Sequence, residues 1–194
     1  WGFALTRGGP RLAGGGVTER NLATFGGTLS TWPADNAGGV AKIRPVASHD
    51  KAISDFCSYR GLLVLSGAID DAPMSPHVVS SDDGKARLWL GAIDDLWRLG
   101  KPRGGGGPWW ATPVDAGVAS DSYLMTGYDH KSFVIEHDAA QPVLFHVEVD
   151  LTGEGLWRRW EPLTVAPGET ARREFPRGFN PYWVRCVAGS SCKA

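Results

Sequence analysis

The sequence predicts an all-β fold, and three observations support this prediction. Short apolar runs alternate with turn residues over residues 53–97. Gly and Pro, which interrupt regular structure, account for 26 and 13 of the 194 residues. No segment repeats its apolar residues with the period of a helix. The expected strands of the central stretch are Ile53–Ser58, Leu62–Ser66, His77–Ser80 and Ala86–Leu90.

This central stretch also contains an internal echo. Leu65–Asp71 (LSGAIDD) returns, slightly altered, as Leu90–Asp95 (LGAIDD). Four short antiparallel strands in about 40 residues is the size of one β-propeller blade, and a radially repeated fold would show such an echo. We therefore predict a partial β-propeller over residues 1–115, about two blades of a longer chain. The alternative is an ordinary four-stranded meander in another all-β fold.

Residues 1–48 begin with Gly-rich loop signals and then contain two expected strands, Asn21–Leu29 and Val40–Ala47. We interpret them as the outer part of a preceding blade. Because two blades cannot close a ring, we expect the remaining blades to precede this sequence in a longer protein.

Residues 116–194 predict a second domain, a small antiparallel β-sandwich. The clearest strand is Val143–Val149, in which apolar residues alternate with His146 and Glu148. Successive side chains of a strand point to opposite faces. We therefore expect Val143, Phe145, Val147 and Val149 to be buried, and His146 and Glu148 to be exposed.

Composition limits the classes of partner and cofactor. The formal net charge is −1, without the basic excess typical of nucleic-acid binding. No apolar run approaches the roughly 18 residues of a membrane span. His130, His137 and His146 are too scattered for a metal triad, and no Cys-x-x-Cys pair occurs. We expect no metal and no cofactor.

Of the three cysteines, Cys57 lies within an apolar strand, whereas Cys186 and Cys192 flank a turn. Three idle thiols and a Cys186–Cys192 disulfide both remain open, and the idle thiols are favoured.

Three segments resemble the C-terminal part of large bacterial secreted proteins that combine a β-propeller with a terminal β-sandwich: Asp55–Val64 (DFCSYRGLLV), Leu88–Trp97 (LWLGAIDDLW) and Gly127–Lys131 (GYDHK). Ser80–Gly84 also resembles the Asp-box turn of sialidase-like propellers, although Arg87 stands in place of its aromatic residue and Trp89 comes two residues late. Propellers of this kind recur among sialidase-like hydrolases, rhamnosidases and polysaccharide lyases. The resemblance therefore implies a secreted or periplasmic protein that acts on glycans, by analogy of fold.

The candidate site lies where Ile53–Ser58 would meet the opening of a propeller channel. We predict His49 and Tyr59 as catalytic residues, because an imidazole titrates near neutral pH and can transfer protons. We predict Asp55 and Arg60 as substrate-binding residues, because a guanidinium binds carboxylate or sulfate groups in a bidentate manner. The alternative is that Asp55 and Arg60 form a structural ion pair and His49 is a loop residue.

Aromatic residues and paired carboxylates complete the candidates. Trp97, Trp109 and Trp110 surround a Gly-rich loop and are predicted to stack on sugar rings, or else to pack one domain on the other. Asp70–Asp71 and Asp94–Asp95 occupy equivalent positions of the echo, which favours turn formation over acid–base chemistry. Trp157, Trp160, Tyr182 and Trp183 are interpreted as packing residues, although a carbohydrate-binding sandwich would use the same residue types.

Two classes of function follow. The first is a glycoside hydrolase or polysaccharide lyase acting on an acidic or sulfated glycan. The second is a non-catalytic module that binds carbohydrate or protein. In both classes we expect a poly- or oligosaccharide as the partner, and in the second class a protein is the other possible partner. We expect no nucleic acid as a partner, no membrane span and a monomeric chain.

Overall fold

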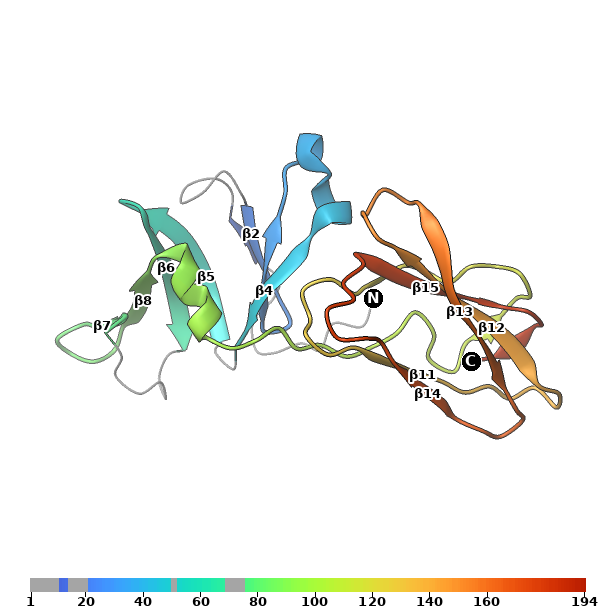
Figure 1. The fold of residues 1–194 in the computed structure, drawn as a ribbon. Helices are drawn as coiled ribbons and strands as arrows, with labels where there is room; N and C mark the ends of the chain where they lie inside the picture. Colours follow the sequence, from blue (N-terminus) through green and yellow to red (C-terminus); the bar gives the residue numbers. More distant parts are fainter. Residues whose placement is uncertain (1–10, 14–20, 50–51, 69–75) are drawn as a thin grey trace. The chain divides into compact units, whose positions relative to one another are not determined.

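The computed structural model describes residues 11–13, 21–49, 52–68 and 76–194. The fold is all-β, as predicted: strands account for 45% and helix for 8% of it, and the helical residues form three short 3-10 turns. The strands form several antiparallel sheets (Figure 1). The described residues divide into two compact units. The first unit ends at Gly104, and the second unit comprises Gly105–Ala194. The sequence-based boundary was placed at about residue 115.

The first sheet follows the order of the chain, β1-β2-β3-β4. Its strands are β1 (Arg11–Ala13), β2 (Asn21–Phe25), β3 (Thr28–Trp32) and β4 (Arg44–Ser48). The single strand expected over Asn21–Leu29 is a hairpin instead, because Gly26 and Gly27 both adopt positive φ and form a two-residue turn. The strand expected from Val40 begins only at Arg44, after the 3-10 turns η1 (Asp35–Ala37) and η2 (Gly39–Lys42).

The second sheet has the order β5-β6-β8-β7, so it is four-stranded as predicted but is not a meander. Its strands are β5 (Ala52–Tyr59), β6 (Leu62–Ala68), β7 (Val78–Ser80) and β8 (Arg87–Gly91), and η3 (Ile93–Arg98) follows. The longer β8, with buried Trp89, occupies the interior position, whereas the three-residue β7 takes the edge. Short strands are well suited to edges, where unpaired backbone groups meet solvent.

The two copies of the sequence echo adopt different structures. Gly67 lies within β6, whereas Gly91 ends β8 and the residues that follow it form η3. Asp70 and Asp71 of the first copy lie outside the described residues. The echo therefore does not mark equivalent positions in two structural repeats.

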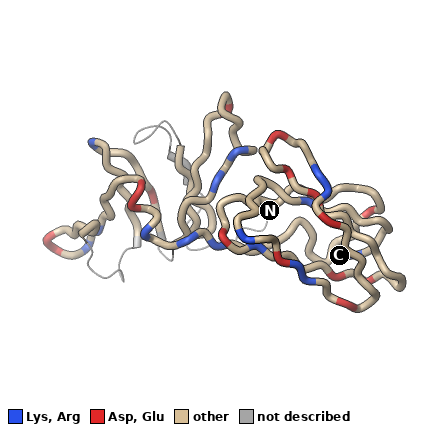
Figure 2. Tube along the Cα trace, in the orientation of Figure 1, with Lys and Arg blue, Asp and Glu red and all other residues tan. Residues whose placement is uncertain are grey.

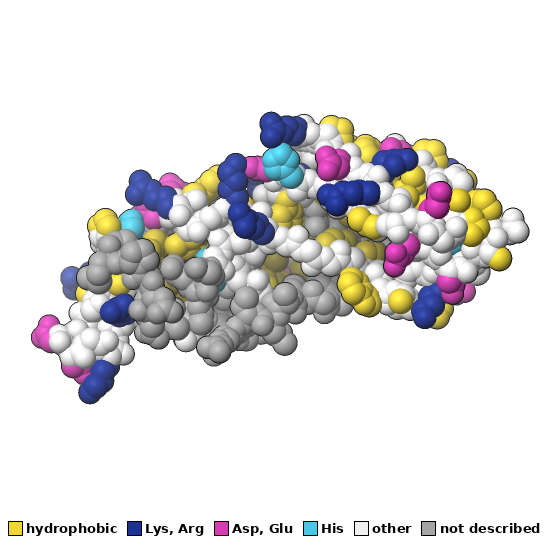
Figure 3. Space-filling model, turned by 90° about the horizontal axis from the view of Figure 1, so that it is seen from below, with side chains coloured by type: hydrophobic (Ala, Val, Ile, Leu, Met, Phe, Trp, Pro, Cys, Tyr) yellow, Lys and Arg dark blue, Asp and Glu magenta, His cyan; other side chains and the backbone are white. Residues whose placement is uncertain are grey.

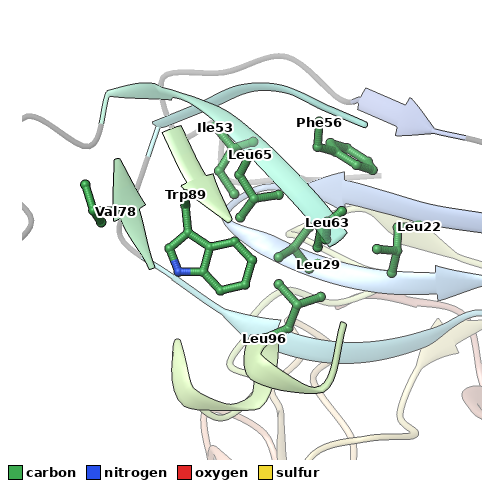
Figure 4. Close-up of a cluster of buried hydrophobic side chains, with 9 residues drawn as sticks. All are labelled: Leu22, Leu29, Ile53, Phe56, Leu63, Leu65, Val78, Trp89 and Leu96. Carbon is green, nitrogen blue, oxygen red and sulfur yellow. The ribbon is translucent and has the colours of Figure 1, made fainter. Parts of the chain in front are cut away.

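The core of the first unit lies between its two sheets (Figure 4). Leu22 and Leu29 come from the first sheet and Leu96 comes from η3. The second sheet supplies Ile53, Phe56, Leu63, Leu65, Val78 and Trp89. Because the second sheet packs on the first sheet through one face only, its other face lies outside this core.

The second unit contains one four-stranded sheet, β10-β15-β12-β13, and two two-stranded sheets, β11-β14 and β16-β9. The strands are β9 (Pro113–Val114), β10 (Tyr123–Leu124), β11 (Ser132–Ile135), β12 (Val143–Asp150), β13 (Trp157–Val165), β14 (Ala171–Glu174), β15 (Trp183–Ala188) and β16 (Cys192–Lys193). Residues of all three sheets meet in apolar clusters around Phe145 and Val147.

Strand β12 confirms one half of the predicted alternation. Val143, Phe145, Val147 and Val149 are buried. The prediction that His146 and Glu148 are exposed is wrong, because both are half-buried. Glu148 Oε2 accepts a hydrogen bond from Arg185 Nε on β15 at 2.8 Å and forms an ion pair with Arg185 Nη2 at 2.7 Å. The Arg185 guanidinium also lies 4.2 Å from the ring centre of Trp157, so this polar face is partly covered by its own side chains.

Candidate functional site

The turn between β5 and β6 holds two of the predicted site residues. Tyr59 pairs with Leu62, and the two intervening residues, Arg60 and Gly61, have φ of 48° and 81°. Positive φ at both central positions is the geometry of a type I′ turn, whose twist matches that of the flanking strands. Glycine accepts this conformation readily, whereas for Arg60 it is unfavourable. Non-glycine residues in such geometry cluster at functional sites, which makes Arg60 a candidate, although Ala111 shares this geometry with φ of 50°.

Arg60 and Tyr59 form a compact pair at the end of the hairpin. The Arg60 guanidinium carbon lies 5.3 Å from the centre of the Tyr59 ring, within cation–π range. The Tyr59 side chain is 58% exposed, and Arg60 is exposed as well. An aromatic surface beside a planar, permanently charged donor group can accept a sugar ring and an adjacent carboxylate or sulfate.

Asp55 lies on the same face of β5 as Tyr59, four residues earlier. Its Oδ1 accepts a hydrogen bond from the Phe56 N–H at 2.9 Å, and a bulge shifts the register between Ile53 and Asp55. No ion pair joins Asp55 to Arg60 in the described structure. The turn has brought the Arg60 guanidinium onto the face of Asp55, but the two charges remain separated along the strand.

His49 follows β4 and lies away from the hairpin. Its N–H donates to the Gly27 carbonyl at 2.8 Å, and both ring nitrogens are shielded from solvent. Strand β5 spans roughly 23 Å from Ala52 to Tyr59. The three residues from His49 to Ala52 reach at most about 11 Å. The Cα atoms of His49 and Tyr59 are therefore roughly 12 Å or more apart, because His49 precedes β5 and Tyr59 ends it.

The three candidate tryptophans differ in their surroundings. Trp97 on η3 is 70% exposed and belongs to the first unit. Trp109 and Trp110 belong to the second unit. Trp109 is half-buried in the apolar cluster around Phe145, with ring centres 6.2 Å apart, whereas Trp110 is 85% exposed. The structure thus gives Trp109 a packing contact, and leaves Trp97 and Trp110 as exposed aromatic rings in different units.

The carboxylates of the turns stabilise backbone. Asp95 Oδ2 accepts a hydrogen bond from the Ala92 N–H at 2.9 Å at the start of η3. In the β7–β8 turn, Asp83 Oδ1 accepts from the Ser81 hydroxyl at 2.6 Å and from the Lys85 N–H at 3.1 Å. These bonds lower the pKa of Asp83, and the Ser81 bond has the largest effect. The side chains that close this turn are Ser81 and Asp83, one residue later than in the Asp-box alignment of Ser80 and Asp82.

The three cysteines are free thiols. Burial, with a smaller effect from Glu148, raises the pKa of Cys186 to about 12, which keeps this thiol protonated and unreactive at neutral pH. Cys57 is exposed on the hairpin strand β5. Within the part of the chain that the structure describes, no group of three or more His, Cys, Asp or Glu side chains could hold a metal ion.

Sequence reasoning missed a second surface, on the face of the β5-β6-β8-β7 sheet opposite the core. Cross-strand pairs on this face are Cys57 with Val64, Val64 with Leu90, and Leu88 with Val79. We call Cys57, Leu62, Val64, Val79, Leu88 and Leu90 the outer apolar face. The signal was present in the continuous apolar runs Leu62–Leu65 and Leu88–Leu90, since strands covered on both faces lack alternation.

Charges of both signs are interspersed along the chain (Figure 2), and acidic and basic side chains are scattered among apolar ones on the face seen in Figure 3. No helix among the described residues is both long and apolar enough to cross a membrane. No family model, curated protein or solved structure matches this chain.

Proposed function

We propose that this chain is a non-catalytic carbohydrate-binding module that recognises acidic glycans through Tyr59 and Arg60. The observation that supports the proposal is the exposed Arg60–Tyr59 pair on a strained two-residue turn. The guanidinium supplies charge-assisted hydrogen bonds to a uronic acid carboxylate or a sulfate, and the phenol ring supplies a surface for the sugar. Because the turn fixes the backbone at Arg60, less conformational entropy is lost on binding.

The separation of His49 from Tyr59 favours binding over catalysis. A hydrolase or lyase needs its acid and base within hydrogen-bond reach of one reacting site. The two predicted catalytic residues lie at opposite ends of β5, and the His49 ring nitrogens are shielded from solvent. The catalytic interpretation therefore has no support from this pair, whereas Tyr59 and Arg60 still act together.

We also propose an architecture for the two units and a cellular location for the protein. We propose that residues 105–194 form a β-sandwich, since the four-stranded sheet shares its core with the β11-β14 and β16-β9 pairs. The order of β1–β4 and the packing of two four-stranded sheets support the interpretation as two propeller blades, while the order β5-β6-β8-β7 departs from a blade. A secreted or periplasmic location is consistent with an acidic polysaccharide as the ligand.

The test measures binding of the full chain to polygalacturonate, to a sulfated polysaccharide and to neutral dextran. We expect the wild type to bind the two acidic polymers and Arg60→Gln to bind them about tenfold more weakly, the loss for one charge-assisted contact. Arg44→Gln, which removes an exposed charge elsewhere in the same unit, serves as the matched control and should bind like the wild type.

Two results would contradict the proposal. Equal binding by the wild type, Arg60→Gln and Arg44→Gln would show that Arg60 takes no part. Depolymerisation of either acidic polymer by the wild type, abolished in His49→Ala, would show that the chain is an enzyme and that His49 is catalytic.

A further inference from the structure

The outer apolar face is unusual for an antiparallel sheet whose other face is packed. Such a sheet normally presents polar residues to solvent. Here Val79 is 56% exposed and Leu88, its direct cross-strand neighbour, is 39% exposed. The row formed by Cys57, Val64 and Leu90 crosses three strands without a polar side chain. Contiguous apolar rows on the solvent face of a sheet make this face a candidate interaction surface.

The two ends of this face carry opposite charge. Asp55 lies in the same row as Leu88 and Val79, and the β7–β8 turn adds Asp82, Asp83 and Lys85 beyond that row. Lys85 pairs with Asp83 at 3.5 Å, and Arg87 lies in the next row of β8, so the three carboxylates of this end exceed its two cations by one charge. At the other end, the Arg60 guanidinium lies over Tyr59, on the same face as Asp55. The surface is therefore complementary to a copy of itself turned end to end.

We propose that a second copy of this chain covers the outer apolar face. A twofold axis between the two sheets, perpendicular to the strands, sets β5 of each copy along β5 of the other, so that Asp55 of one copy lies towards Arg60 of the other. The central row then faces its own equivalent, so that Cys57 lies opposite Cys57 of the second copy. Such an interface is isologous and closes as a dimer.

The size of the face sets the strength of this contact. The outer apolar face consists of three cross-strand rows of side chains, which are two residues apart along each strand. Because the four strands lie about 4.8 Å apart, the face covers an area on the order of 300 Å². A stable interface buries about 800 Å² on each partner. The dimer is accordingly weak: it forms at the high concentrations of an NMR sample and dissociates on dilution. The sequence-based expectation is a monomer, and the concentration dependence of association distinguishes the two.

Sedimentation velocity of the full chain over a wide concentration range tests the proposal, in the absence of any glycan. We expect the wild type to shift towards a dimer as its concentration rises, and Val79→Asp to stay monomeric. Val134→Asp is the matched control: Val134 also lies in a strand and is 55% exposed, but belongs to the second unit. Circular dichroism checks that each variant is folded. A wild type that remains monomeric throughout, or equal association by the two Asp variants, would overturn the proposal.

A charge exchange tests the orientation. Asp55→Arg and Arg60→Asp should each weaken association several-fold, and the double variant should restore it, because the exchanged charges again meet across the interface. A short bismaleimide should cross-link the wild type through Cys57 and leave Cys57→Ser as monomer. Failure of the double variant to restore association would overturn the end-to-end arrangement. Since no glycan is present, these results do not depend on the proposed carbohydrate binding, which is measured separately with Arg60→Gln.

Discussion

Asp150 is a buried carboxylate that organises the turn after β12. Its Oδ1 accepts hydrogen bonds from the N–H groups of Thr152 and Gly153, at 3.1 and 2.9 Å, and its Oδ2 accepts one from Gly155 at 2.7 Å. Burial raises the pKa of Asp150, but the backbone N–H groups together lower it by more, and the net pKa lies below the ordinary value of 3.8. The Asp150 carboxylate thus accepts hydrogen bonds from backbone N–H groups that would donate to backbone carbonyl groups in a tight turn.

Replacing Asp150 with Asn should destabilise the second unit by about 1–3 kcal/mol, because the amide NH₂ cannot accept a backbone hydrogen bond. A lowered pKa stabilises the fold at pH values above the pKa of the unfolded chain, and this contribution is lost as pH falls through the lowered folded pKa. Urea unfolding of the wild type and Asp150→Asn should therefore differ most at neutral pH, and the difference should shrink as the pH falls below the ordinary aspartate pKa of 3.8. Asp121→Asn, at an exposed position, is the control. A difference that does not depend on pH would contradict this assignment.

At the scale of the element, β12 shows how one strand serves two environments. Phe145 is fully buried and contacts the rings of Trp109 and His137. Its neighbour Leu144 points to the other face and is 39% exposed. The alternation of the strand decides which of two adjacent apolar residues enters the core.

Phe145→Ala should destabilise the second unit by about 3–5 kcal/mol, since a large buried side chain is lost and a cavity is left. Leu144→Ala, on the same strand, should change the free energy of unfolding by about 0.5 kcal/mol or less. Chemical denaturation monitored by circular dichroism compares the two. Similar losses for both variants would mean that the outer face of this sheet is covered in solution.

At the scale of the whole molecule, each unit has its own apolar clusters. The second unit depends on residues that precede the sequence-based boundary of 116. Trp109 packs on Phe145, Val114 is buried, and the backbone of Thr112 exchanges two hydrogen bonds with Ala194, at 2.9 and 3.1 Å. Residues 105–115 are therefore part of its structure.

We expect a fragment of residues 105–194 to fold alone, and a fragment of residues 116–194 to be less stable by at least about 2 kcal/mol. The shorter fragment loses β9 and the Trp109 ring, which exposes part of the core. Urea denaturation and amide NMR dispersion of both fragments provide the measurement. Equal stability of the two fragments would instead place the boundary where the sequence suggested it.

The site was predictable only where it depended on local chemistry. The Tyr59–Arg60–Gly61 turn was visible as a break between two apolar runs, and the structure pairs Tyr59 with Arg60 there. His49 was grouped with them because it is near in sequence, but an extended strand separates residues quickly, and β5 carries Tyr59 away from it. Sequence proximity overestimated spatial proximity for this reason.

The sequence by itself determined the all-β class, the buried residues of β12 and the presence of a turn at Tyr59–Gly61, since each follows from local alternation or turn chemistry. Only the tertiary structure decided that β8 takes the interior position beside β6, that the two echo copies differ, and that Glu148 is covered by Arg185. Strand order and cross-strand partners depend on long-range packing, which a pattern read along one strand does not contain.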